Sequence, residues 1–157
     1  MGGSNVERAL VVVDGTDQGD RLLQKAGAIA AGVGTKLYLF ATVDPDEFDE
    51  TRATLDVIAD VENTSYSDRD ALQSIHTRLE QAVAETFEEP AFEYETIGSV
   101  TDPDDRASRI IAAAREYDCE HVFISGRSRS PTGKALFGDT VQSVLLNFDG
   151  DITVRLG

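Results

Sequence analysis

The sequence has few of the residues on which metal centres and covalent catalysts rely. It contains one cysteine and two histidines in 157 residues. Cys119 has no partner for an intramolecular disulfide, and its place beside the apolar run 121–124 favours a buried structural thiol over a nucleophile. His76 and His121 are far apart in the sequence, and no Cys/His cluster has the spacing of metal ligands. Neither a metal centre nor a thiol nucleophile is predicted.

Positive charge is also scarce. There are 14 Lys and Arg against 29 Asp and Glu, for a formal net charge of -15. This charge opposes nonspecific binding to nucleic acid and to anionic membranes, so neither is an expected partner. Because only three of the basic residues are lysines, the composition is typical of a salt-adapted cytoplasmic protein from a salt-loving (halophilic) organism.

Long apolar runs are missing as well. No segment approaches membrane-spanning length, and the amino terminus has no basic segment followed by an apolar core. Residues 1–157 are expected to form a single cytoplasmic domain, with residues 1–6 as a flexible lead-in.

What the sequence does have is an alternation of strand-like and helix-like segments. Segments that predict strands lie at 9–13, 37–43, 92–97, 122–124 and 152–154. The continuous apolar run of the first is expected of a strand that is buried on both faces of a parallel sheet. Strands that alternate with helices predict an α/β fold, an open parallel sheet with helices on both faces, Rossmann-like in architecture.

Four helices are predicted between these strands. The first is expected to begin with Asp17 as its capping residue and to end at Gly34. Residues 72–87 place apolar side chains at helical spacing. The Asp-Pro pair at 102–103 predicts the start of a third helix, with a capping acid followed by proline at the first helical position. The fourth is predicted at 141–146.

Residues 44–70 have a different character. Ten of them are acidic, and few are large and apolar. We interpret the segment as a mobile acidic excursion with one short helical piece at 51–60. Disorder and a lid over a ligand are both compatible with a long insertion of this kind.

The segment 126–138 runs against the charge of the chain, because it carries Arg127, Arg129 and Lys134 and no acidic residue. A glycine-rich cationic loop between a strand and a helix can bind phosphate through its amides and the helix dipole. The other interpretation is an ordinary connection with solvated arginines. It is not a Walker A loop, since Ala135 follows Lys134 where that motif has the hydroxyl that binds magnesium.

Ligands of such sheets bind beyond the carboxyl ends of the strands, where residues 13–16, 42–44 and 126–138 are expected to meet. Asp14 directly follows four apolar residues, so its carboxylate is expected at the mouth of the crevice. There it can accept hydrogen bonds from hydroxyls such as those of a ribose, or it can cap the next turn. No pair of acids can be singled out as general acid and base, and no catalytic residue is predicted.

From about Glu7 to Leu156, these residues and their order resemble the universal stress protein family. The resemblance is carried by the opening Leu-Val-Val-Val-Asp-Gly-Thr at 10–16 and by the closing segment from Val122 through Gly126 to Leu146. It implies a five-stranded parallel sheet in the order 3-2-1-4-5, related to the adenine nucleotide alpha hydrolase fold. It further implies a homodimer joined through the final strand, an unidentified protein partner, and bound ATP or another adenine nucleotide, with or without Mg²⁺. Any ATP hydrolysis would be slow.

Carried over position by position, the resemblance implies a set of binding residues. Asp14, between Val13 and Gly15, would meet the adenosine, and the backbone at Thr42 and Val43 would contact the adenine. The residues implied to hold the phosphates are Gly126, Arg127, Arg129, Ser130, Gly138, Asp139 and Thr140.

The loop departs from the family's nucleotide-binding pattern G-x2-G-x9-G-[ST]. Arg129 replaces the second glycine, Gly138 comes one residue early, and Asp139 stands at the hydroxyl position. A carboxylate there repels phosphate and can itself occupy the anion site as an N-cap. Two functions therefore stay open: a regulator that binds an adenine nucleotide, and a nucleotide-free dimeric interaction module in which Asp139 fills the phosphate site.

Overall fold

In the computed structural model, the described residues are 7–46, 48–50, 68–126 and 138–156. The strands are β1 (Arg8–Val12), β2 (Lys36–Val43), β3 (Tyr94–Val100), β4 (His121–Gly126) and β5 (Asp151–Leu156). The helices are α1 (Asp17–Val33), α3 (Asp68–Thr86), the 3-10 helix η2 (Pro103–Asp105), α4 (Arg106–Glu116) and α5 (Asp139–Asn147). This alternation confirms the predicted α/β class.

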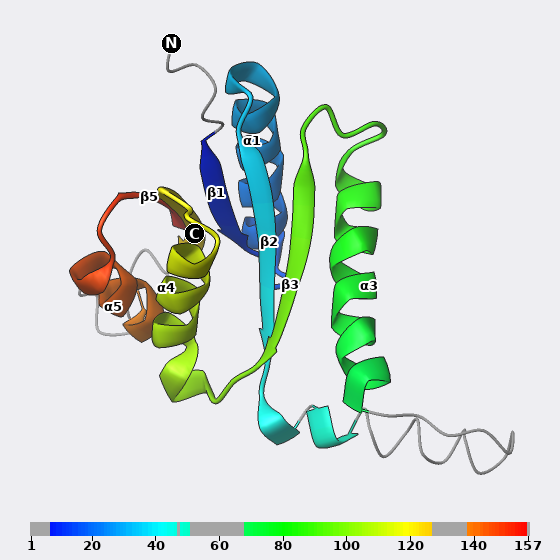
Figure 1. The fold of residues 1–157 in the computed structure, drawn as a ribbon, viewed down its shortest axis with the longest axis vertical. Helices are drawn as coiled ribbons and strands as arrows, with labels where there is room; N and C mark the ends of the chain where they lie inside the picture. The colour runs from blue at the N-terminus through cyan, green and yellow to red at the C-terminus, as the bar shows by residue number, and fades with distance from the viewer. Residues whose placement is uncertain (1–6, 47, 51–67, 127–137, 157) are drawn as a thin grey trace, which may run out of the picture.

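The five strands form one parallel sheet in the order β3-β2-β1-β4-β5, as predicted. Strand β1 lies at the centre, where Leu10 is level with Tyr38 of β2 and Val122 of β4. In Figure 1 the carboxyl ends of β2 and β3 point downward, and α3 and α4 begin at the same edge. The polar groups that follow the strands and those that begin the helices therefore gather at one edge of the sheet.

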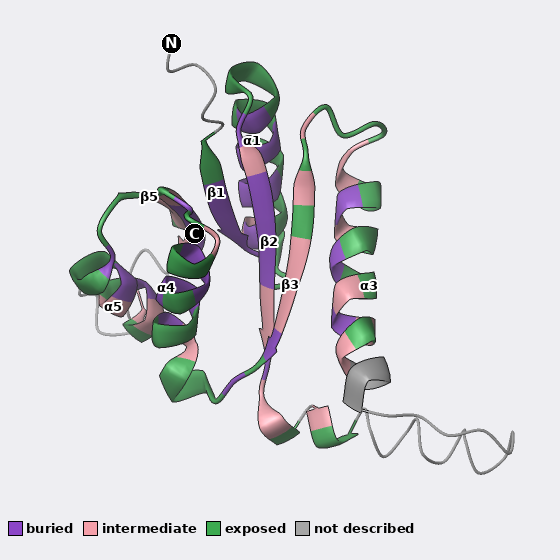
Figure 2. Ribbon diagram, viewed as in Figure 1, coloured by how far each residue is buried: buried purple, intermediate pink, exposed green. Residues whose placement is uncertain are grey.

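Helices cover both faces of the sheet. Ala9 and Val11 of β1 pack on the side of α1 and α3, whereas Leu10 and Val12 pack on the side of α4 and α5. All four side chains are at most 4% exposed, and Figure 2 shows that β1 and its neighbour β2 are largely buried. The prediction that this apolar run forms a strand buried on both faces is confirmed.

Helix α1 begins with a cap from Thr16. The backbone of Thr16 is extended, and its Oγ1 accepts a hydrogen bond from the backbone N of Gly19 at 3.0 Å. The prediction that Asp17 caps this helix is wrong, because the Thr16 hydroxyl makes the capping bond and Asp17 is the first helical residue. Helix α1 ends, as predicted, at Gly34, which has the left-handed φ of 80° that glycine tolerates.

The start of the next helix after β3 also differs from the prediction. The pair Asp102-Pro103 opens η2 rather than an α-helix, and Asp102 makes no side-chain capping bond. The backbone N of Asp105 donates to the carbonyl of Asp102 at 2.9 Å, which closes a tight 3-10 turn. Helix α4 therefore begins only at Arg106.

The acidic segment 44–70 is described at its two ends. Residues 45–46 and 48–50 are helical, and residues 68–70 belong to α3. The helical piece expected at 51–60 lies outside the described residues.

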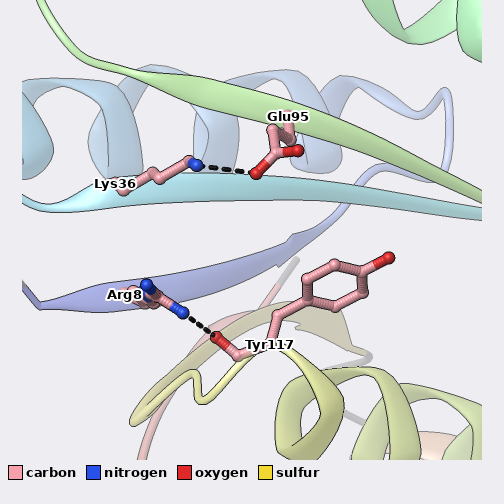
Figure 3. A network of polar contacts seen from close by, with 4 residues as sticks. All are labelled: Arg8, Lys36, Glu95 and Tyr117. Carbon is pink, nitrogen blue, oxygen red and sulfur yellow. Dashed lines mark hydrogen bonds and ion pairs between the residues drawn. The ribbon is translucent and has the colours of Figure 1, made fainter.

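The edge of the sheet where the strands begin carries a separate polar network, shown in Figure 3. Lys36 Nζ on β2 forms an ion pair with Glu95 Oε2 on β3 at 2.6 Å. Arg8 on β1 donates from Nη1 to the carbonyl oxygen of Tyr117 at 3.1 Å, and the ring of Tyr117 lies 4.9 Å from that of Tyr38. These contacts join β1, β2 and β3 to the end of α4, away from the edge where the helices begin.

Two glycines in α1 provide a test of how this helix packs. A Cβ at Gly27 would collide with the ring of Phe87, whereas a Cβ at Gly32 would meet no atom within 4 Å. We expect Gly27→Ala to lower the free energy of unfolding by about 1–3 kcal/mol, because the ring must move. Gly32→Ala should raise it by about 0.5–1 kcal/mol, because alanine favours a helix.

Urea denaturation of both variants measures this difference. If both substitutions raised the free energy of unfolding by the same amount, the close packing of α1 against Phe87 would be contradicted.

Candidate functional site

A cavity of about 990 Å³ lies at the carboxyl edge of the sheet. The ends of β1, β2 and β4 contribute to its lining, together with residues of α1, α3, α4 and α5. Its polar lining includes Asp14, Thr42, Thr101, Ser125 and Thr140. A cavity of this size and position is typical of a site for a cofactor-sized molecule at the switch point of an α/β sheet.

The Asp14 carboxylate accepts hydrogen bonds from two segments, the turn that follows β1 and the end of β4. Its Oδ1 accepts hydrogen bonds from the backbone N of Thr16 at 3.0 Å and from Thr16 Oγ1 at 2.6 Å. Its Oδ2 accepts one from Ser125 Oγ at 2.5 Å, although Ser125 is 111 residues away in the sequence. Asp14 therefore does cap the turn after β1. Because a carboxylate has about four acceptor positions, it retains room for about one more donor.

These contacts decide the ionisation of Asp14. Partial desolvation acts to raise the pKa of its carboxyl group. The hydrogen bonds from Ser125 and Thr16, with the positive charge of Arg106, outweigh that effect and lower the pKa below its ordinary value. Asp14 is thus a carboxylate at neutral pH, able to accept hydrogen bonds and not to donate one.

Two glycines permit this geometry. Gly15 has a φ of 76°, which lets the chain turn away from the sheet directly after Asp14. Gly19 lies under the carboxylate, where any Cβ would collide with Asp14 Oδ1. Sequence reasoning did not single out Gly19, because the contact becomes visible only when the turn is folded.

The structure brings together about half of the predicted binding residues. Those that line the cavity are Val13, Asp14, Gly15, Thr42, Val43 and Thr140. Gly126, Gly138 and Asp139 are described but do not belong to its lining. Arg127, Arg129 and Ser130 lie outside the described residues.

The start of α5 corrects one expectation. The N-cap residue is Gly138, with a φ of 90°, and Asp139 is the first residue of the helix. The possibility that Asp139 acts as the N-cap is therefore not realised, because Gly138 holds the N-cap position and Asp139 is already helical. The Asp139 side chain is exposed.

Several cavity residues were not predicted from the sequence. Thr101, Arg106 and Ser125 follow β3, begin α4 and end β4, and Arg78 and Glu85 come from α3. The Ser-Gly pair that ends β4 was a usable signal for Ser125. No signal pointed to the α3 residues, because helical spacing identifies a buried face without showing that part of it borders a cavity.

Two further titratable side chains, Cys119 and His121, do not line this cavity. Cys119 is buried, and burial raises the pKa of its thiol to about 12, which agrees with a structural role. The His121 ring stacks on Phe123, contacts Thr153 Oγ1 at 2.7 Å, and has its pKa lowered by burial. Among the residues described, no group of three or more His, Cys, Asp or Glu could hold a metal ion. None of the described helices is long and apolar enough to cross a membrane.

The fold and cavity together define an α/β protein with a cavity at the switch point of a 3-2-1-4-5 sheet. The chain belongs to the universal stress protein family, whose sequence pattern it matches over residues 5–154. A comparison with curated proteins gives no match.

Solved structures of this family share the fold. A universal stress protein from Archaeoglobus fulgidus is 23% identical, with a TM-score of 0.64 over 96% of this chain and 98% of that one. A universal stress protein in complex with cAMP is 19% identical, with a TM-score of 0.58 over 96% and 97%. A universal stress protein from Archaeoglobus fulgidus in complex with dAMP is 16% identical, with a TM-score of 0.56 over 96% and 97%.

The lowered pKa of Asp14 makes a prediction about stability and pH. Since the folded-state pKa is below the ordinary value of 3.8, the stabilisation is present above that pH and is lost as the pH falls through the folded-state pKa. At pH 7, Asp14→Asn should lower the free energy of unfolding by about 1 kcal/mol, because the amide cannot accept all three bonds. The deficit should shrink when both proteins are unfolded in urea near pH 3.

Asp149→Asn is the matched control, since it removes the same charge from an exposed position in the turn before β5. A deficit of Asp14→Asn that stays constant between the two pH values would contradict the assigned hydrogen bonds.

Proposed function

We propose that this protein is a regulator of the universal stress type that binds an adenine nucleotide, with ATP as the preferred ligand, in the cavity at the carboxyl edge of the sheet. The observation that carries the proposal is the ionised, doubly anchored Asp14 at that cavity. Its carboxylate retains room for about one further donor, such as a ribose hydroxyl.

The rest of the cavity fits the same ligand. Apolar side chains at the strand ends, such as Val43 and Ile124, offer surface for a flat base. Two relatives with this fold are in complex with cAMP and with dAMP, which are both adenine nucleotides. These relatives support an adenine nucleotide as the class of ligand.

Calorimetric titration of the full chain tests the proposal. In high potassium chloride, ATP should show saturable binding in the micromolar range, and the titration should be run with and without Mg²⁺. Asp14→Ala should weaken this binding about tenfold or more, equivalent to about 1.4 kcal/mol, because it removes the acceptor and releases the Thr16 turn. Asp17→Ala is the control: it removes an exposed acid three residues away that does not line the cavity.

No saturation up to millimolar ATP, ADP or AMP would overturn nucleotide binding. Asp139→Ser then separates the alternative function, in which Asp139 fills the phosphate site of a nucleotide-free interaction module. Under that alternative the variant should acquire ATP binding that the native chain lacks. Under our proposal the native chain already binds ATP, and Asp139→Ser should only change the affinity of that binding.

We further propose that two copies pair through β5, and that the dimer signals to a protein partner in the cytoplasm of a salt-adapted cell. Strand β5 is at the end of the described sheet and pairs only with β4 there, so its other edge has unpaired backbone groups. Leu156 on this strand is 41% exposed, and Ile152 and Val154 are only partly buried.

Light scattering in high salt should therefore give about twice the chain mass of 17.0 kDa. Leu156→Asp should weaken the dimer about tenfold or more, because two added charges would be desolvated near the pairing edge. Val33→Asp, at an exposed position at the end of α1, should leave the mass unchanged. A native chain that stays monomeric at high concentration would contradict pairing through β5.

A further inference from the structure

Arg106 is a cationic residue of the cavity lining that comes from the start of α4 and not from the cationic loop 126–138. It is the first residue of α4 and lines the cavity together with Ser125 at the end of β4 and Thr140 in the first turn of α5. Helices α4 and α5 lie on the same face of the sheet and contact each other. Arg106 is therefore on the side of the cavity where α5 begins.

One hydrogen-bond donor of the Arg106 side chain has no partner among the described residues. Its Nε is buried and has no hydrogen-bond partner. Buried donors are almost always paired in proteins, so an unpaired donor on a residue that lines a cavity is a candidate ligand contact. Arg106 lines the cavity, and its planar guanidinium fork has the geometry to match two oxygens of a phosphate.

No ion pair joins Asp14 to the Arg106 guanidinium. The Asp14 oxygens accept hydrogen bonds from Thr16 and Ser125, and among the described residues Arg106 takes part in no ion pair. The attraction between the two charges is long-range, and it favours the ionised form of Asp14. No acidic side chain among the described residues therefore engages the Arg106 guanidinium in an ion pair.

The charge of the cavity makes this cation important. Its described lining holds four acidic side chains, Asp14, Asp20, Asp44 and Glu85, and two basic ones, Arg78 and Arg106. Arg78 belongs to α3, on the opposite face of the sheet from α5. An anionic group near the beginning of α5 therefore has Arg106 as its described cationic partner.

We propose that Arg106 binds the phosphate of the ligand and makes the cavity select nucleotides over nucleosides. This inference rests on the proposed binding of an adenine nucleotide, and it adds a specific residue and a specific group on the ligand.

Titration calorimetry with AMP and adenosine tests it on the full chain. Arg106→Gln should weaken AMP binding about tenfold or more and change adenosine binding less than about twofold, because adenosine lacks the phosphate. Arg106→Lys should bind AMP with intermediate affinity, since lysine keeps the charge and loses the fork. Arg109→Gln is the matched control: it removes the same charge from α4 at an exposed position outside the cavity, and AMP should bind it like the native chain.

The outcomes separate this inference from the proposed function. Equal AMP affinity of the native chain and Arg106→Gln would overturn the inference and leave nucleotide binding intact. Equal losses for AMP and adenosine, or equal losses in Arg106→Gln and Arg109→Gln, would also overturn it, because they indicate a structural or a general charge effect. A native chain that binds neither compound would overturn the proposed function and the inference with it.

Unfolding of the free variants removes the remaining ambiguity. Arg106→Gln should still unfold in a single cooperative transition, because no described residue pairs with its Nε or forms an ion pair with it. AMP should raise the unfolding temperature in the native chain and in Arg109→Gln, and much less in Arg106→Gln. Stabilisation of Arg106→Gln by AMP to the native extent would count against a phosphate contact.

Discussion

Burial of β1 on both faces is the constraint on which the architecture depends. Its side chains alternate between two cores, so one pair of helices has to cover each face of the sheet. In a parallel sheet every covering helix then begins at the edge where the strands end. Asp14 is the second residue beyond β1 at that edge, which is why a single carboxylate reaches both the start of α1 and the end of β4.

The Asp14 carboxylate links the two halves of the site by simple chemistry. It is fully used as an acceptor toward Thr16 on one oxygen and partly used toward Ser125 on the other. Hydrogen bonds from uncharged donors keep it ionised without an adjacent ion pair. A carboxylate held in this way has a defined position and still has capacity for a ligand hydroxyl.

The net charge of this protein is negative, whereas the residue proposed to bind the phosphate is positively charged. A chain with a formal charge of -15 repels an anionic ligand at long range, and salt weakens that repulsion more than it weakens a direct contact. A phosphate therefore depends on short-range partners within the cavity. Arg106 is the residue that we propose for this role, because it lines the same cavity as Thr140 of α5 and its Nε has no partner among the described residues.

The sequence by itself determined the class of fold, most strand and helix positions and the place of Asp14, because hydrophobic periodicity and the end of a buried strand are local properties. It did not determine the cap of α1 or the start of α4, where neighbouring polar groups compete and the folded backbone decides between them. The strand order came from resemblance to a family, since periodicity does not specify which strands are neighbours. Only the tertiary structure placed Ser125 on Asp14, Gly19 beneath it and Arg106 in the same cavity. The physical reason is that these contacts join residues through the folded turn and across strands, and a linear pattern carries no record of such distances.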